Sequence, residues 1–394
     1  MVERRPLPLE GIRVCDLSRA WAGPACTRLL AQMGAEVIKI EGPQTPDMGR
    51  QWPPFAEDKP EGLNRSGFFA LFHGNEKDCL LDLKTPEGLD AIKSLIRISD
   101  VVIDNFAPRV MPNLGLDYES LKDVKPDIIM ISLSGYGANG PDRNRAAFAQ
   151  VLGTYAGESM ITGHPGGQKS VGVGSDQIAG LTGAFTVLAA LHYRDLTGEG
   201  QFIDLAEVES LLATNPEAIM EYVMTGRLPT AQGNRDYVHA PQGCYRCQGE
   251  DRWVAISVGS DSEWQDLCRV MGKPELIDDE RFRDTFSRLH HQDELDNLIS
   301  EWTTGQNSVD AMTRLQQSGV AATHVNDGRD VYQDPHLKAR ECFVEIEHPE
   351  VGKRKVVGVF AKLSATPGII KRDPLFGEHT DWLLNELLPA DDNE

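Results

Sequence analysis

The chain has 394 residues, 40% of them hydrophobic and 25% charged, which is typical of a globular protein with a substantial core. Its formal net charge of −21 argues against nucleic acid and anionic membranes as partners. The seven cysteines are scattered, the N-terminus lacks a signal-peptide pattern, and no apolar run is long enough to cross a bilayer. We therefore expect a cytoplasmic protein of two domains or one large elaborated domain.

The first third of the chain alternates strand and helix patterns. Short apolar runs predict strands at Ile12–Leu17, Glu36–Ile40, Val101–Asn105 and Ile128–Ser134. Helical patterns lie between them at Pro24–Met33, Pro86–Ile98 and Tyr118–Lys122. Strands that alternate with helices form a parallel sheet covered on both faces, so we expect a Rossmann-like α/β fold. Ligands of such folds bind beyond the carboxyl ends of the strands.

The middle of the chain is mostly helical. Helical patterns run from Leu181 to about Thr225, with a break near Gly198 and a strand-like run at Phe202–Asp204. Turn-forming and polar residues then predict that Leu228–Gly243 is a long connection.

A second module begins at about Cys244. Its predicted strands and helices, together with two later strands, are Trp253–Val258, Glu263–Met271, Leu295–Trp302, Val309–Ser318, Val344–Glu347 and Val356–Phe360. We therefore expect a large domain at 1–225, a smaller inserted α+β domain with its linkers at 226–325, and a return to the large domain at 326–394.

Several common chemistries lack their sequence patterns. The turn after the first strand, Asp16–Pro24, has no G-x-G-x-x-G, and the chain has no Walker A pattern, which argues against NAD and ATP. A serine hydrolase would need G-x-S-x-G, and a zinc protease would need H-E-x-x-H; neither is present. We therefore expect no catalytic metal and no permanently bound cofactor.

One carboxylate stands out in a glycine-flanked turn. Asp176 lies in Gly172–Gly180, which leads into the apolar helical pattern from Leu181 to His192. Small neighbours let a substrate approach, and a helix N-terminus favours an anion, so Asp176 is a candidate nucleophile. The alternative is an N-cap, because Asp often satisfies the free N–H groups at a helix start.

Segments along the whole chain share one family likeness. They are Leu9–Val14, Ala22–Pro24, Gly34–Glu41, Leu81–Gly88, Asp104–Phe106, Ser134–Gly137, Thr197–Gln201 and Leu375–Thr380. Together and in this order they resemble the class III CoA-transferases, the family of formyl-CoA and carnitine CoA-transferases. The resemblance implies that Asp176 attacks a donor acyl-CoA, such as succinyl-CoA, to form an aspartyl anhydride. An aspartyl-CoA thioester follows, and a carboxylic acid acceptor then receives CoA.

The resemblance also implies a CoA site. By motif position, Arg19, Trp21 and Ala22 line the thiol end, and Asn105 and Phe106 lie near the pantetheine arm. Asn75 and Lys77 fall on a patch that resembles the family's Asn-Lys-Arg pattern, from which Lys77 is expected to reach a phosphate, and Arg109 is a further candidate phosphate ligand. Tyr136 lies between two glycines, which permit close ligand approach, so we expect it to form a wall of the site.

Several of these residues have structural alternatives. Trp21 and Phe106 are equally well read as core residues, and Asn105 as the end of its strand. Lys77 and Arg109 are alternatively solvated surface charges. The chain also departs from formyl-CoA transferase, which has Gln at the position of Trp21; the larger apolar side chain suggests an acid larger than formate or oxalate.

Two other functions compete with transfer. The α-methylacyl-CoA racemase branch shares the fold and the aspartate but needs a histidine at a position that here is Phe148, which cannot move a proton. The second alternative is a non-catalytic subunit of a heteromeric transferase, which the presence of Asp176 argues against. The family further implies a homodimer of interlocked chains, and a heteromer is the alternative.

Overall fold

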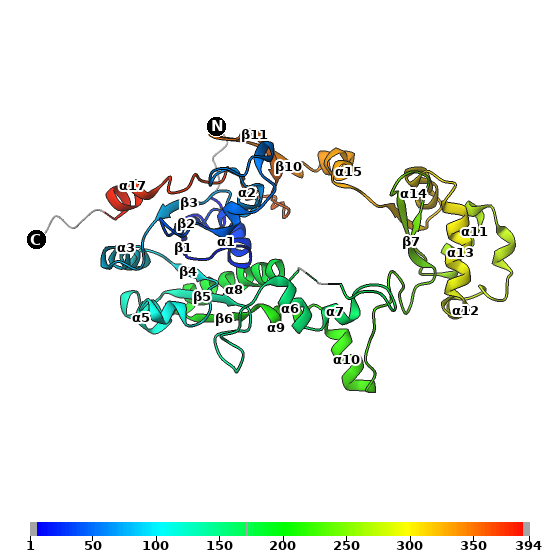
Figure 1. Cartoon of the computed structure of the whole chain (residues 1–394), viewed down its shortest axis with the longest axis horizontal. Helices are drawn as coiled ribbons and strands as arrows, with labels where there is room; N and C mark the ends of the chain where they lie inside the picture. The colour runs from blue at the N-terminus through cyan, green and yellow to red at the C-terminus, as the bar shows by residue number, and fades with distance from the viewer. Residues whose placement is uncertain (1–5, 171, 173, 389–394) are drawn as a thin grey trace, which may run out of the picture. The chain divides into compact units, whose positions relative to one another are not determined.

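The computed structural model describes residues 6–170, 172 and 174–388 (Figure 1). The chain divides into two compact units. The first contains the described residues of 1–159, 171–227 and 338–394, and the second contains 160–170 and 228–337. Compared with the predicted small domain at 226–325, the second unit extends to Leu337 and also takes in Met160–Ser170.

Six parallel strands form the sheet of the first unit, in the order β3-β2-β1-β4-β5-β6. They are β1 (Arg13–Asp16), β2 (Glu36–Glu41), β3 (Lys77–Leu80), β4 (Val101–Asp104), β5 (Ile129–Ser134) and β6 (Phe202–Ala206). In this order, which is that of Rossmann folds, the chain changes from one half of the sheet to the other between β1 and β4. The predicted Rossmann-like α/β sheet is confirmed.

Helices connect these strands. In the first unit they are α1 (Ala22–Gln32), α2 (Gly67–Phe72), α3 (Pro86–Arg97), α4 (Val110–Asn113), α5 (Tyr118–Val124), α6 (Ala149–Tyr155), α8 (Ser175–Thr197), α9 (Glu207–Leu212), α10 (Pro216–Thr225) and α17 (Thr380–Trp382). Short 3-10 or π turns are η1 (Met48–Gln51), η2 (Ala56–Asp58) and η4 (Leu383–Leu387), and α7 (Glu158–Ile161) and α16 (Pro335–Ala339) span unit boundaries. Among the described residues, no helix combines the length and hydropathy of a membrane span.

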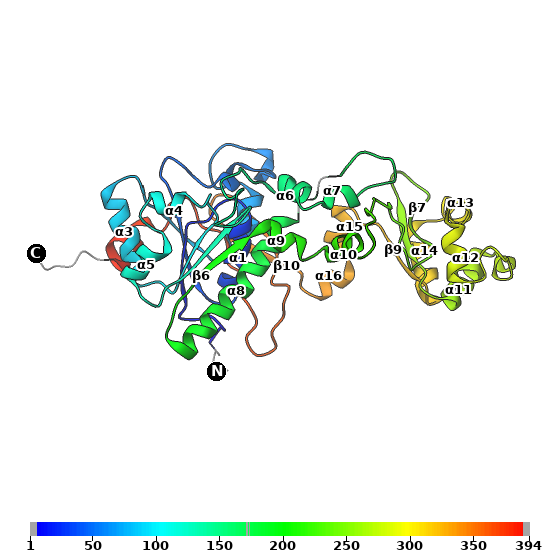
Figure 2. The same cartoon turned by 90° about the horizontal axis from the view of Figure 1, so that it is seen from below.

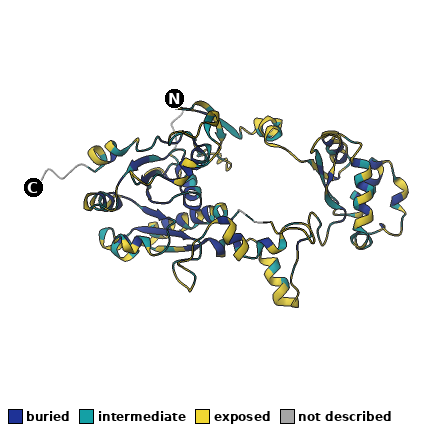
Figure 3. Cartoon of the chain, in the orientation of Figure 1, coloured by how far each residue is buried: buried dark blue, intermediate teal, exposed yellow. Residues whose placement is uncertain are grey.

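Side chains of the central strands alternate between two hydrophobic cores. In β4, Val101 and Ile103 face the core that α1 and α8 complete. Val102, between them, faces the core that α3 and α5 complete on the other side of the sheet. Because both faces are covered, all four residues of β4 are buried (Figure 3).

Helices α1 and α8 lie side by side (Figure 2). Glycines of α8 allow this close packing. A Cβ atom at Gly180 would lie 2.9 Å from the carbonyl oxygen of Ala22, and one at Gly183 would lie 3.4 Å from Sγ of Cys26. Any side chain at Gly180 would therefore push the helices apart. The close contact sets the start of α8 beside the start of α1.

The edge strand β3 was not predicted from the sequence. It has only four residues, and two of them, Lys77 and Asp78, are charged. The C-terminal segment covers this edge: the N–H of His379 donates to the carbonyl of Asp78 (2.8 Å), and the N–H of Leu80 donates to Oγ1 of Thr380 (3.0 Å). Covering an edge strand in this way removes a free template for aggregation.

The second unit has its own α+β core. Its antiparallel strands are β7 (Gln242–Arg246), β8 (Trp253–Ser257) and β9 (Ala321–His324). Its helices and turn are α11 (Asp261–Met271), η3 (Pro274–Ile277), α12 (Thr285–His290), α13 (Gln292–Thr303), α14 (Ser308–Gln317) and α15 (Gly328–Gln333). Trp264, Ile299 and Leu315 pack with Ile256 of β8. A separate hairpin, β10 (Phe343–His348) and β11 (Gly352–Val357), belongs to the first unit.

Candidate active site

A cavity of about 740 Å³ opens at the carboxyl ends of the parallel strands. The turns after β1 and β4 line this cavity, together with the end of β5 and the loop that follows β5. Strands β1 and β4 are the neighbours between which the chain changes from one half of the sheet to the other. Sequence-predicted residues that it contains are Arg19, Trp21, Asn105, Phe106, Arg109 and Asp176. Ligands of open α/β sheets bind at this position.

The side-chain amide of Asn105 joins the two turns. Its Oδ1 accepts the backbone N–H of Arg19 (2.8 Å), and its Nδ2 donates to the carbonyl oxygen of Arg19 (2.7 Å). Asn105 therefore bonds to backbone, as the structural alternative proposed, but to the turn after β1 rather than to its own strand end. The bonds fix the turn that carries Arg19 and Trp21 against β4.

Aromatic side chains form the apolar wall of the cavity. Trp21 lines it and also packs edge-to-face on Phe68, with ring centroids 5.3 Å apart. Phe106 and Trp52 line the same space, and the guanidinium of Arg19 lies 5.9 Å from the ring centroid of Phe106. Such a wall offers a ligand an apolar surface.

Three polar atoms of lining residues are buried without a hydrogen-bond partner among the described residues: Nε of Arg19, Nε1 of Trp21 and Oγ of Ser134. Buried polar groups normally have partners, and their absence around a cavity indicates groups that a ligand satisfies.

Asp176 lies in the first turn of α8 but is not its N-cap. The cap residue is Gly174, which offers no side chain, and Asp176 follows Ser175 inside the helix. The N-cap interpretation of Asp176 is therefore wrong, because the helix begins before this residue. Its carboxylate instead faces the cavity.

Burial raises the pKa of Asp176 to about 6. The nearby backbone N–H groups of Asp176 itself and of Ala22 act in the opposite direction and lower this pKa, since they stabilise the anion. Ala22 was predicted to line the CoA thiol site; it is fully buried outside the cavity lining and contacts Asp176 through its backbone. At pH 7 the carboxylate form of Asp176 predominates, poorly solvated and therefore reactive.

A second carboxyl group, Glu207, was missed by the sequence reading. It is the first residue of α9, directly after β6, only 8% exposed, and it lines the cavity with Asp176. Burial, and then the negative charge of Asp176, raise the pKa of Glu207 to about 8. At pH 7 one of the two groups is therefore a carboxylate and the other a neutral acid.

Four arginines line the cavity of this acidic chain: Arg19, Arg109, Arg143 and Arg145. Arg145 pairs with Asp142 at 3.0 Å. Arg109 and Arg143 form no ion pair with another described residue, so their charge is available to a ligand. Arg143 and Arg145 were not predicted, because they lie on an irregular loop without a motif.

Comparison with known proteins decides the family. The model of CoA-transferase family III matches residues 9–380. The chain belongs to this family. Succinyl-CoA--D-citramalate CoA-transferase of Chloroflexus aurantiacus is 34% identical over 389 residues, covering 98% of this chain and 95% of the relative. The beta subunit of succinyl-CoA--L-malate CoA-transferase from the same organism is also 34% identical, over 397 residues, 98% of this chain and 96% of the relative.

A solved structure agrees. A CAIB/BAIF family protein from Brucella suis superposes with a TM-score of 0.87 at 29% identity, covering 96% of this chain and 99% of that one. The recognition of a class III CoA-transferase is thus confirmed, and the chain is an enzyme that transfers CoA, with a CoA thioester as substrate.

Besides Ala22, three further residues predicted to bind CoA lie outside the lining of this cavity of the transferase. The amide of Asn75 donates to the carbonyl of Ile369 (2.9 Å), and Nζ of Lys77 bonds Glu36 (2.7 Å) and lies 3.5 Å from the ring centroid of Trp382. Tyr136 lines a separate hollow beyond β5. Their contact with CoA stays a prediction.

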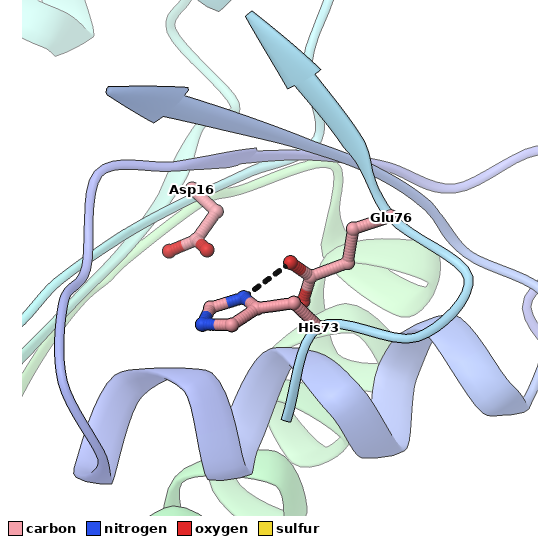
Figure 4. Close-up of side chains that lie close together, drawn as sticks. All are labelled: Asp16, His73 and Glu76. Carbon is pink, nitrogen blue, oxygen red and sulfur yellow. Dashed lines mark hydrogen bonds and ion pairs between the residues drawn. The ribbon is translucent and has the colours of Figure 1, made fainter. Parts of the chain in front are cut away.

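A buried charge cluster lies behind the turn after β1 (Figure 4). Asp16, His73 and Glu76 have donor atoms close enough to hold a metal ion, and Nδ1 of His73 bonds Glu76 at 2.7 Å. Nζ of Lys39, also fully buried, lies 2.9 Å from Asp47 and 4.0 Å from Asp16. The ammonium group of Lys39 is therefore the cation that lies beside the carboxylates of Asp16 and Asp47. None of the three cluster residues lines the cavity, and the expectation of no catalytic metal stays a prediction.

Proposed function

We propose that this family III enzyme moves CoA from succinyl-CoA to a free dicarboxylic acid, with Asp176 as the covalent nucleophile. The observation that carries the proposal is the position of Asp176 in the cavity at the strand ends, where the nearby backbone N–H of Ala22 acts to lower the pKa of its carboxyl group. Two helix N-termini stabilise the anion there, while burial keeps it poorly solvated.

The reaction proceeds in four balanced acyl transfers. The carboxylate of Asp176 attacks the thioester carbonyl, and a mixed anhydride forms as CoA thiolate leaves. The thiolate attacks the aspartyl carbonyl, which releases the donor acid as its carboxylate and leaves an aspartyl-CoA thioester. The acceptor carboxylate and the thiolate then repeat these steps in reverse, and Asp176 is regenerated as a carboxylate. No net proton is consumed, and the acyl group stays activated throughout.

The charges of the cavity support a dicarboxylic substrate. CoA carries phosphates, and a dicarboxylic thioester keeps one free carboxylate, so both need cations in a chain of net charge −21. The guanidinium groups of Arg109 and Arg143 are available at the cavity. The names of the two relatives give succinyl-CoA as donor, and citramalate and malate are both dicarboxylic acids.

Adduct analysis tests the proposal. The enzyme is incubated with succinyl-CoA and digested, and the peptide that contains Asp176 is analysed by mass spectrometry. We expect a CoA adduct on this peptide in the wild type and none in Asp176→Ala, which also loses CoA exchange. A wild-type enzyme without an adduct, or an Asp176→Ala variant that still exchanges CoA, would overturn the covalent scheme.

The racemase alternative gains no support. Phe148, at the position that a racemase needs for histidine, lines the cavity and is 59% exposed. None of the described lining residues is a histidine, so a proton-transfer partner for Asp176 of that kind is missing from them. Deuterium incorporation at the α-carbon of an acyl-CoA at turnover rates would reverse this conclusion.

We further propose that the chain works as a homodimer in the cytoplasm. The residues of α10 are all at least partly exposed (Figure 3). They include the apolar side chains of Met220, Val223 and Met224. Phe185 and Leu181 expose a further apolar strip on α8. Exposed apolar side chains that lie together on two helices normally contact another chain. The seven cysteines are all free, which suits a reducing compartment such as the cytoplasm. Light scattering after size exclusion distinguishes a dimer from a monomer, and a co-purified second chain would indicate a heteromer.

A further inference from the structure

Glu207 reaches the cavity because β6 ends directly at it. The N–H of its neighbour Val208 donates to the carbonyl of Gly135 (3.1 Å), which pins the first turn of α9 to the end of β5. Helix α8 packs against α9, so the first turns of the two helices present Asp176 and Glu207 to one space. Glu207 itself forms no hydrogen bond or ion pair with a described residue, and the charge of Asp176 adds to burial in raising its pKa.

The elements around α9 hold few other charges. Titratable side chains on the elements packed against it are Asp176, His192, Tyr193, Arg194 and Asp195 of α8, Tyr155 of α6 and Asp204 of β6. Of these, Asp176 alone acts on the ionisation of Glu207, and no arginine of the cavity does so. A negative charge at Glu207 would have no ion-pair partner among the described residues, because no cation lies within ion-pair distance of it.

We propose that Glu207 is kept as a neutral carboxylic acid beside Asp176 and donates a hydrogen bond to the acyl oxygen of the group that Asp176 attacks. The proposal rests on the nucleophilic role of Asp176 proposed above. When a carboxylate attacks a carbonyl, negative charge develops on the carbonyl oxygen, and a fixed donor lowers the barrier. The proton stays on Glu207 in every step.

Asp176 and Glu207 divide these roles because their surroundings differ. Two carboxyl groups in one buried cavity do not both ionise readily, so the proton remains on the group with fewer donors. Backbone N–H groups of Asp176 itself and of Ala22 act to lower the pKa of Asp176, whereas no hydrogen bond from a described residue lowers that of Glu207. A neutral acid at Glu207 also avoids repelling the anionic acceptor acid.

The pH profile of CoA exchange distinguishes this role from a merely structural one. In the wild type the rate rises as Asp176 ionises near pH 6 and falls as Glu207 loses its proton near pH 8. Glu207→Gln keeps a donor that cannot ionise, so we expect a rate within about tenfold of wild type and no decline near pH 8. Glu207→Ala removes the donor, and we expect a loss of about 100-fold at pH 7.

Glu209→Gln is the matched control, because Glu209 is an exposed residue of the same helix outside the cavity lining. It should keep both the rate and the decline near pH 8. A Glu207→Gln enzyme that retains that decline at the same pH would overturn the proposal, as would a Glu207→Ala enzyme with the wild-type rate and profile.

Infrared difference spectroscopy tests the protonation without substrate. Wild type minus Glu207→Gln at pH 7 should contain the C=O stretch of a neutral carboxylic acid, and this band should be lost above pH 9. Its absence at pH 7 would overturn the inference about Glu207 while leaving the Asp176 adduct unaffected. Conversely, a missing adduct with the band present would contradict only the nucleophilic mechanism.

Discussion

A Cβ atom at Gly180 of α8 would lie 2.5 Å from the Cβ of Ala25 in α1, closer than carbon atoms approach one another. The absence of a side chain at Gly180 thus sets the spacing of these helices. Their N-termini meet near Asp176, and the backbone N–H of Ala22 acts to lower the pKa of its carboxyl group. The geometry of the proposed nucleophile therefore depends on a residue one turn further along its helix.

Gly180→Ala tests this dependence. Alanine in a helix normally stabilises by up to about 1 kcal/mol relative to glycine, but here the clash with backbone and Cβ atoms outweighs that gain. We expect a free energy of unfolding lower by about 1–3 kcal/mol and slower adduct formation at Asp176. Chemical denaturation measures the first quantity. Gly328→Ala in α15, where nothing lies within 4 Å of an added Cβ, should show no loss.

Asn105→Ala should disconnect the turns after β1 and β4. The substitution leaves the N–H and carbonyl of Arg19 without their partner, which costs roughly 1–3 kcal/mol of unfolding free energy. Because the turn carries Arg19 and Trp21, we also expect a higher KM for succinyl-CoA. Asn113→Ala removes an exposed amide at the end of α4 and serves as the control. Equal effects of the two substitutions would contradict the role of Asn105.

Asp176→Asn should abolish exchange and yet stabilise the fold at neutral pH. The folded pKa of Asp176, about 6, lies above the ordinary value of 3.8, so the native state binds the proton more tightly than the unfolded state. The resulting destabilisation is present in full above pH 6 and disappears below pH 4. At pH 7 we expect a gain on the order of 2 kcal/mol in unfolding free energy.

The gain in Asp176→Asn should shrink as the pH of the denaturation experiment falls from 7 to 4. Asp195→Asn, an exposed residue of the same helix, provides the control and should change stability little. A stability gain that is constant from pH 4 to 7 would mean that burial of the charge is not its cause.

Arg143→Ala should weaken substrate binding rather than chemistry. The guanidinium lines the cavity without an ion pair to another described residue, so its removal takes away charge that an anionic substrate uses. We expect the KM for succinyl-CoA to rise about tenfold with kcat little changed, and the difference to shrink at high salt. Arg97→Ala, on exposed α3 surface, should leave KM unchanged. A fall in kcat alone would argue against a binding role.

The sequence predicted those parts of the fold whose signals are local. The apolar runs of β1, β2, β4 and β5 are buried on both faces, so their patterns were clear. Strand β3 was missed because it is short, and Lys77 and Asp78 make it polar. The strand is covered by the segment around His379, and the N–H of Asp78 donates to the His379 side chain. These residues are about 300 positions apart in the sequence, so no local pattern predicts their contact.

The site residues also divide into those with a local sequence signal and those placed by contacts between distant parts of the chain. Asn105, Arg109 and Asp176 follow strand ends or precede a helix, and the parallel topology brings them to one cavity. Glu207 was missed because the strand-like run was ended at Asp204, whereas β6 continues to Ala206. Asn75 matched a family motif, but its side chain bonds the returning C-terminal segment, a contact that motif position does not reveal.

The covering of β3 by residues from the end of the chain affects folding during synthesis. Every residue that lines the cavity has been translated once Glu207 has left the ribosome. The edge of the sheet, however, waits for His379 and Thr380, which emerge more than 170 residues later. Until then a nascent chain carries a complete set of site residues but lacks the segment that covers the β3 edge of the sheet.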